Sequence, residues 1–147
     1  MSIHARPIFI VDDDPSFIAV LEDTLRYLGF HAVPVLKARE VVPRALAERP
    51  SVILLDLTLD EGDGYDVAKA IREEPELSST PILFLSGRDR WMDTEYARRF
   101  GADDYVSKPV TRASLLKKMH AVIAARSFLA TSRQQTEASI EIVDSKQ

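Results

Sequence analysis

The chain has 147 residues, which points to one domain, and its 46% hydrophobic and 29% charged residues are those of an ordinary globular protein. A formal net charge of -4 argues against direct contact with nucleic acid, because a nucleic-acid binder usually carries a basic face. The absence of cysteine excludes disulfides, thiolate metal sites and cysteine nucleophiles. Without a signal peptide or an apolar run long enough for a membrane span, the expectation is a cytoplasmic protein that does not contact membranes.

Short apolar runs alternate with segments of helical spacing along the chain, and there are five of each. The expected strands lie at residues 7–11, 31–36, 52–55, 81–85 and 104–106. The expected helices are marked by apolar residues three or four apart, namely Phe17, Leu21, Leu25 and Leu28, then Val41, Val42, Ala45 and Leu46, then Tyr65, Ala68 and Ile71, then Met92, Tyr96 and Phe100, and finally Leu115, Met119 and Val122.

Capping residues support these helix boundaries. Asp14 is expected to cap the first helix, Pro15 suits its first turn, and Gly29 suits its end. Gly101 stands where the fourth helix should end, and Thr111 is the expected cap of the last helix.

Repeated alternation of strand and helix predicts parallel strands joined by right-handed crossovers. The fold class is therefore α/β, a doubly wound five-stranded parallel sheet in a (βα)5 sandwich. From Ser127 onward the composition shifts to Ser, Thr, Gln and Glu. We expect residues 1–126 to form the domain, and residues 127–147 to be a C-terminal tail or an extension of the last helix.

Polar side chains stand at the carboxyl ends of four predicted strands, where ligands bind in an open parallel sheet. The first strand ends at Asp12–Asp14, the third at Asp56, the fourth at Ser86 and the fifth near Lys108. Each residue alone has an ordinary structural interpretation as a cap, a turn residue or a surface charge, and the hypothesis of a site depends on their joint placement. Crowded carboxylates need a cation, and Mg²⁺ prefers carboxylate and phosphate oxygens. An aspartate can itself accept a phosphoryl group while a lysine neutralises charge, so the set suits phosphoryl transfer.

The sequence resembles the receiver domain of two-component response regulators, of the kind found in chemotaxis regulators. The resemblance covers about residues 7–126. The motifs that carry it are Ile10–Asp14, Leu54–Leu57, Gly62–Gly64, Leu85–Gly87 and Tyr105–Pro109. It implies the flavodoxin-like strand order 2-1-3-4-5. It also implies a protein that is not an enzyme in the usual sense, with only slow self-phosphorylation and dephosphorylation.

The resemblance implies a role for each residue of the site. Asp56 corresponds to the phosphoacceptor, and Lys108 to the lysine that contacts the phosphoryl group. Mg²⁺ would be held by the side chains of Asp12, Asp13 and Asp56 together with the backbone carbonyl of Thr58. Two residues correspond to the conformational switch, namely Ser86 and Tyr105. Pro109 occupies the position at which the family has a cis peptide.

The implied partners are a sensor histidine kinase or a phosphotransfer protein, and a downstream protein that docks on the face formed by the fourth helix, fifth strand and fifth helix. Candidate contacts on that face are Trp91, Tyr96, Arg98 and Lys117. The sequence departs from the family at Asp60, where proline is usual, and positions Thr58 and Arg88 flank the site where they affect water access to the acylphosphate.

Two other interpretations stay open. In a phosphatase of the haloacid-dehalogenase type, Asp12 would be the nucleophile and Asp14 the acid and base, but Lys108 then comes in the wrong order and Asp56 has no role. In a receiver-like binding module that does not use phosphate, one or more of the five site residues is typically lost, whereas this sequence has all of them.

Overall fold

The computed structural model describes residues 6–87 and 91–145, with side chains as far as residue 129. Its main sheet has five strands, and each hydrogen-bonded pair of strands is parallel. In chain order the strands are β1 (Ile8–Val11), β2 (Ala32–Val35), β3 (Val52–Asp56), β6 (Ile82–Ser86) and β7 (Asp104–Ser107). They lie in the order β2-β1-β3-β6-β7, which confirms the predicted order 2-1-3-4-5 and the doubly wound fold class.

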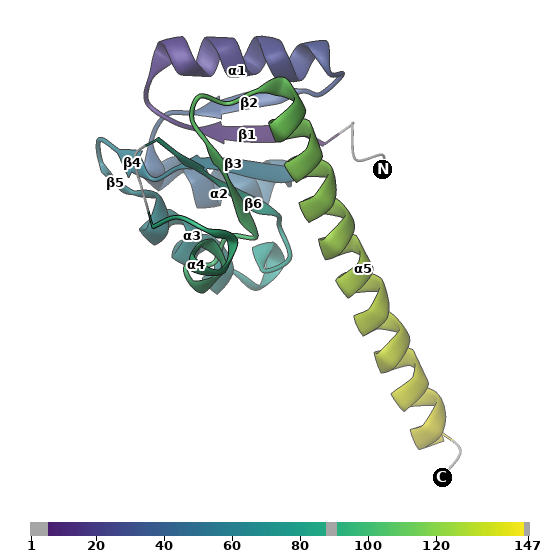
Figure 1. Cartoon of the computed structure of the whole chain (residues 1–147). Coiled ribbons are helices and arrows are strands. Elements are labelled where there is room, and N and C mark those ends of the chain that lie inside the picture. Colours follow the sequence, from purple (N-terminus) through teal and green to yellow (C-terminus); the bar gives the residue numbers. More distant parts are fainter. Residues whose placement is uncertain (1–5, 88–90, 146–147) are drawn as a thin grey trace.

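Helices cover both faces of the sheet (Figure 1). Helices α1 (Pro15–Tyr27) and α5 (Arg112–Ser145) contribute to the core on one face. Helices α2 (Ala38–Glu48), α3 (Gly64–Glu73) and α4 (Thr94–Arg99) contribute to the core on the other, and a 3-10 turn, η2 (Pro75–Leu77), follows α3. The central strands β1, β3 and β6 are buried along their whole length because helices cover both faces of the sheet, and successive residues of β1 alternate between the two cores.

The predicted caps of four helix ends are confirmed. The Asp14 carboxylate accepts hydrogen bonds from the backbone amides of Ser16 and Phe17, at 3.0 and 3.4 Å. The Thr111 hydroxyl accepts from the amide of Ser114 at 3.2 Å. Gly29 and Gly101 follow α1 and α4 with positive φ values of 90° and 99°, a conformation that glycine adopts at little steric cost.

Two features differ from the sequence-based expectation. Helix α4 begins only at Thr94, so Met92 and Phe100 lie outside it, because the Asp93 carboxylate caps the helix by accepting the amide of Tyr96 at 2.7 Å. The segment after β3 contains an unpredicted antiparallel hairpin of β4 (Thr58–Leu59) and β5 (Gly62–Asp63). Helix α5 runs on to Ser145, which is the second of the two forms expected for this segment, and its C-terminal half extends away from the sheet (Figure 1).

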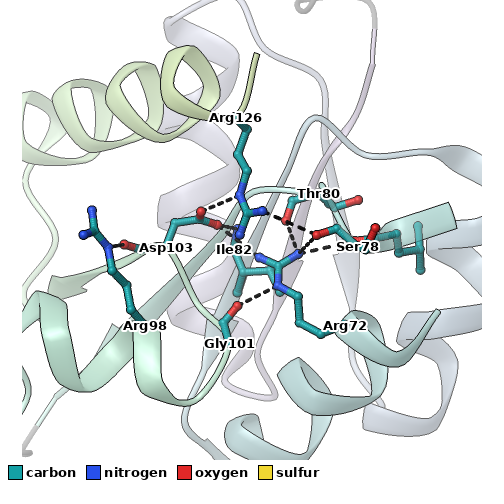
Figure 2. Close-up of polar contacts among 9 residues, drawn as sticks. Arg72, Ser78, Thr80, Ile82, Arg98, Gly101, Asp103 and Arg126 are labelled. Atoms are coloured by element: carbon teal, nitrogen blue, oxygen red, sulfur yellow. Dashed lines mark hydrogen bonds and ion pairs between the residues drawn. The ribbon is translucent and has the colours of Figure 1, made fainter. Parts of the chain in front are cut away.

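Asp103 ties α5 to the rest of the domain at the amino ends of β6 and β7 (Figure 2). Its carboxylate accepts from Arg126 Nε of α5 at 2.6 Å, from an Arg72 amino group of α3 at 3.1 Å, and from the amide of Ile82 at 2.9 Å. Arg72 also donates to the carbonyl of Gly101 at 2.8 Å and to three carbonyls of the segment before β6. Burial lowers the pKa of Arg72 to about 10, so this guanidinium is still charged at neutral pH.

None of the helices in the described ranges is both long and apolar enough to cross a membrane.

Candidate phosphoryl-transfer site

The parallel register brings the ends of β1 and β3 together. Val11, the last residue of β1, pairs with Leu55, so Asp12 and Asp13 follow β1 beside Asp56 at the end of β3. Each of these three aspartates offers a carboxylate oxygen, and the three oxygens lie within 4.8 Å of one another. The structure thus brings together the three acidic residues that the sequence analysis selected.

Asp12 is the most enclosed of the three, with a fully buried side chain. One carboxylate oxygen accepts the backbone amide of Asp14 at 2.9 Å, and the other lies 3.3 Å from Lys108 Nζ. Each oxygen therefore has a donor, which offsets the cost of burying the charge.

Asp56 is buried but reachable, with 12% of its side chain exposed. Its Oδ1 accepts the amide of Thr58 at 3.1 Å, and its Oδ2 lies 3.5 Å from Lys108 Nζ. Burial raises the pKa of Asp56 above its ordinary value, and the negative charge of Asp12 raises it further, while Thr58 and Lys108 oppose the shift. The charged form of Asp56 is thus disfavoured in this site, and a cation bound beside it would stabilise that form.

Gly64 allows α3 to begin directly against Asp56. A Cβ atom at this position would lie 2.4 Å from the Asp56 carbonyl oxygen and 2.9 Å from Leu57 Cα. The amide of Gly64 donates to the Leu57 carbonyl at 3.0 Å and closes this turn. Because only a residue without a side chain fits here, Gly64 is part of what fixes the backbone on which Asp56 stands.

Asp13 lies nearer the surface than Asp12 and contacts the hairpin. Its Oδ2 accepts the backbone amide of Asp60 at 2.8 Å. The charge of Asp13 raises the pKa of the exposed Asp60 carboxyl group. Asp60, the position where the family usually has proline, thus contributes an amide donor that proline lacks.

Ser86 and Lys108 come from the neighbouring strand ends. Ser86 is the buried last residue of β6, and its carbonyl accepts the amide of Lys108 at 2.8 Å. This bond places Lys108 just past the end of β7, from where its ammonium reaches both Asp12 and Asp56. The Lys108–Pro109 peptide is cis, as the resemblance implied.

Tyr105 lies on β7, and β6 stands between this strand and the acidic cluster at the ends of β1 and β3. It is half-buried in β7, and Lys118 Nζ of α5 lies 4.4 Å from its ring centroid. Arg88, the flanking position noted in the sequence, lies outside the described residues.

The donor set fits a hard divalent cation. Three carboxylates provide the oxygen ligands that Mg²⁺ prefers, and Lys108 supplies only one positive charge among them. Thr58, whose backbone carbonyl the resemblance adds to this set, is the exposed first residue of β4 and follows Asp56 by two positions.

Phe17 is a neighbour of the site that the sequence analysis assigned only to the core. Its ring centroid lies 4.2 Å from Lys108 Nζ. The sequence does indicate this position. The first turn of the helix that follows the first strand must lie at the same edge of the sheet as the end of that strand, and Phe17 is in that turn.

Comparisons with known proteins agree on one family. The model of the response regulator receiver domain family matches residues 8–120. The chain is 33% identical over 129 residues to the transcriptional regulatory protein PrrA of Mycobacterium tuberculosis, covering 88% of this chain and 54% of that protein. It is 31% identical over 117 residues to protein PilH of Pseudomonas aeruginosa, covering 80% of this chain and 97% of that protein.

Solved structures give the same result. The receiver domain of a Pseudomonas aeruginosa sensor histidine kinase, with a magnesium ion in its active-site cleft, superposes with a TM-score of 0.74 at 31% identity, covering 81% of this chain and 98% of that one. The Vibrio cholerae chemotaxis protein CheY4 gives a TM-score of 0.73 at 26% identity, covering 80% of this chain and 98% of that one. The chain spans about half the length of several curated relatives that it matches, such as 56% of the Bacillus subtilis regulator PhoP.

Proposed function

Because the chain belongs to the response regulator receiver domain family, we propose that its Asp56 accepts a phosphoryl group, with Mg²⁺ as cofactor, from the histidine of a sensor kinase or phosphotransfer protein. The observation that carries this assignment is the meeting of three carboxylates and Lys108 at the carboxyl edge of the sheet. A receiver domain is a signalling module, because the reaction proposed here phosphorylates its own Asp56 side chain.

In the proposed reaction an Asp56 carboxylate oxygen attacks the phosphorus atom of phosphohistidine. A P–O bond forms, the P–N bond breaks, and the imidazole leaves with the electron pair. Lys108, which already contacts Asp56, would bind a phosphoryl oxygen, and the Ser86 hydroxyl would donate to another. The side chains of Asp12, Asp13 and Asp56 and the carbonyl of Thr58 would hold Mg²⁺. The chemistry that the ion supplies when bound is neutralisation of charge on the phosphoryl group.

Incubation with phosphoramidate and Mg²⁺ tests the reaction. The expected result is one phosphoryl group per chain, labile to base and hydroxylamine, and absent when a chelator removes Mg²⁺. Asp56→Asn should abolish labelling, while its thermal unfolding remains cooperative. A folded chain that takes no phosphoryl group would instead favour a receiver-like binding module.

The phosphatase alternative receives no support from the family match. In the structure Asp14 serves as the cap of α1, with its carboxylate on two helix amides, which leaves it poorly suited to the acid and base role of that alternative. A measured release of phosphate through a covalent intermediate on Asp12 would support the phosphatase alternative instead.

For the output we propose that the phosphoryl group draws Ser86 inward and that Tyr105 turns into the space left behind. The contact of Lys118 with the Tyr105 ring would then break, and this would change the face of α4, β7 and α5 on which a downstream protein docks. Trp91, Arg98 and Lys117 are exposed there, and Tyr96 is half-buried.

A beryllofluoride complex compared with the free protein by NMR tests this switch. We expect shifts at Tyr105, Lys118 and α4 in addition to those around Asp56. Shifts confined to the loops at Asp56 and Ser86 would reject the switch and leave a phosphate-binding site alone.

We also propose residues 1–126 as the receiver domain and residues 127–147 as a C-terminal segment outside its core, in which α5 continues as far as Ser145. The exposed side chains of Phe128 and Leu129, 70% and 55% accessible, fit this division.

A further inference from the structure

The ammonium group of Lys108 contacts an aromatic ring as well as two carboxylates. Its Nζ lies 3.3 Å from Asp12 Oδ2, 3.5 Å from Asp56 Oδ2 and 4.2 Å from the centroid of the Phe17 ring. A cation at this distance from a ring centroid is attracted by the negative charge density of the ring face. Lys108 thus has an attractive partner that carries no charge.

The position of Phe17 is fixed from two sides. Its backbone amide donates to the Asp14 carboxylate at the start of α1, and Pro15 constrains the same turn. Its side chain is half-buried and packs against the core between the sheet, α1 and α5. The ring is therefore held beside the acidic cluster by the fold and needs no contribution from the lysine.

The three partners of Lys108 differ in what they do when the site is occupied. In the proposed function, on which this inference rests, Asp12 and Asp56 bind the metal ion, and Asp56 also accepts the phosphoryl group. Either event weakens the attraction of these carboxylates for the ammonium. A phenyl ring has no lone pair with which to bind Mg²⁺, and it cannot accept a phosphoryl group, so its attraction for Lys108 persists.

We propose that Phe17 is a positioning residue that keeps the Lys108 ammonium over the site when Asp12 and Asp56 are engaged. Without it, the flexible lysine chain, 26% exposed, would turn toward water as the metal enters. Phe17 acts through Lys108 and touches neither the metal nor the phosphoryl group.

The ring face, and not apolar bulk alone, is what the inference requires. Phe17→Leu keeps an apolar side chain on α1 but removes the ring, and Phe17→Tyr keeps the ring as a matched control. At saturating Mg²⁺, the loss of a cation–π contact predicts that Phe17→Leu takes a phosphoryl group from phosphoramidate between about twofold and thirtyfold more slowly. Phe17→Tyr should restore a rate close to that of the unmodified chain, and the Mg²⁺ affinity should be the same in all three proteins.

A double-mutant cycle separates positioning from packing. In a Lys108→Ala background, Phe17→Leu should have no further effect on the phosphorylation rate. An equal slowing with and without Lys108, or a Phe17→Tyr protein as slow as Phe17→Leu, would overturn the proposal and leave Phe17 as a packing residue.

A measurement that does not depend on phosphorylation keeps this inference apart from the proposed function. In the NMR spectrum of the unmodified chain, the ring current of Phe17 should shift the ε protons of Lys108 upfield, and the shift should persist at saturating Mg²⁺. Loss of the shift when Mg²⁺ is added would overturn the inference even if Asp56 accepts phosphate. A persistent shift in a protein that does not accept phosphate would support the contact and contradict the proposed function alone.

Discussion

At the scale of single residues, Asp12, Asp13 and Asp56 are held together against their mutual repulsion. Lys108 and backbone amides offset part of the cost, while burial and then the charge of Asp12 raise the pKa of Asp56. A cation that neutralises part of this negative charge is therefore expected to stabilise the folded chain.

Mg²⁺ should raise the melting temperature of the unmodified chain, by a stabilisation of about 1.4 kcal/mol when the ion is present at ten times its Kd. Asp13→Ala should remove this response, because it removes a proposed ligand. The metal-free variant should be as stable as the unmodified chain or more stable, since relief of repulsion offsets the lost bond to the Asp60 amide.

Asp14→Asn is the matched control, because asparagine also caps a helix and Asp14 is outside the acidic cluster. Thermal unfolding during a Mg²⁺ titration measures the change in melting temperature of the unmodified chain, Asp13→Ala and Asp14→Asn. An unchanged response in Asp13→Ala would contradict its assignment as a ligand.

Gly64 and Gly87 offer a second paired test at this scale. A Cβ at Gly64 would collide with the Asp56 backbone, whereas a Cβ at Gly87 would meet only Lys108 Cδ at 3.7 Å, an ordinary contact. Gly64→Ala should destabilise the fold by about 1–3 kcal/mol, as overpacking does, and Gly87→Ala should change it little. Chemical denaturation measures both, and equal stabilities would show that α3 can move away from Asp56 without cost.

At the scale of elements, the Asp103 cluster joins α3, β6, the turn before β7 and α5 (Figure 2). Asp103→Ala removes the carboxylate that two guanidinium groups share, leaves these groups with carbonyl acceptors alone and takes an acceptor from the Ile82 amide, so it should cost about 2 kcal/mol or more. Arg98→Ala should cost less than about 0.5 kcal/mol, because Arg98 is exposed and donates to the Asp103 backbone carbonyl, which the substitution leaves in place. Similar losses of stability in denaturant for the two variants would contradict a structural role for the Asp103 carboxylate.

The sequence predicted the sheet well because its three central strands are short apolar runs bounded by polar residues. The strand ends then located Asp12, Asp13, Asp56, Ser86 and Lys108, because parallel strands present their carboxyl ends at one edge. The β4–β5 hairpin could not be predicted, since its strands have two residues each and show no alternating pattern. The start of α4 was misplaced because Met92 has helical spacing but precedes the Asp93 cap.

Contacts between side chains far apart in the sequence were beyond prediction. The Arg72–Asp103 and Asp103–Arg126 pairs join residues 31 and 23 positions apart, and no local pattern marks them. The contact of Phe17 with Lys108 depends on how α1 is rotated about its own axis. Helical periodicity predicts which face of the helix points to the core, but not the rotation angle that such a contact requires.

At the scale of the whole molecule, Arg126 is the last residue of α5 with a described bond to the body of the domain. A chain that ends at Leu129 should therefore match the melting temperature of the full chain and should retain phosphorylation of Asp56. A chain that ends at Ala125 loses the contact with Asp103 and should melt at a lower temperature. If the chain that ends at Leu129 is also much less stable, the extension of α5 contributes to stability, and the proposed division at residue 126 is wrong.

The covalent position of the phosphoryl group tests the central claim most directly. After incubation with phosphoramidate and Mg²⁺, peptide mapping by mass spectrometry should find the phosphoryl group on Asp56, the carboxylate that lies against Lys108 and within reach of solvent. A phosphoryl group on Asp12 would contradict the account and would support the phosphatase interpretation instead.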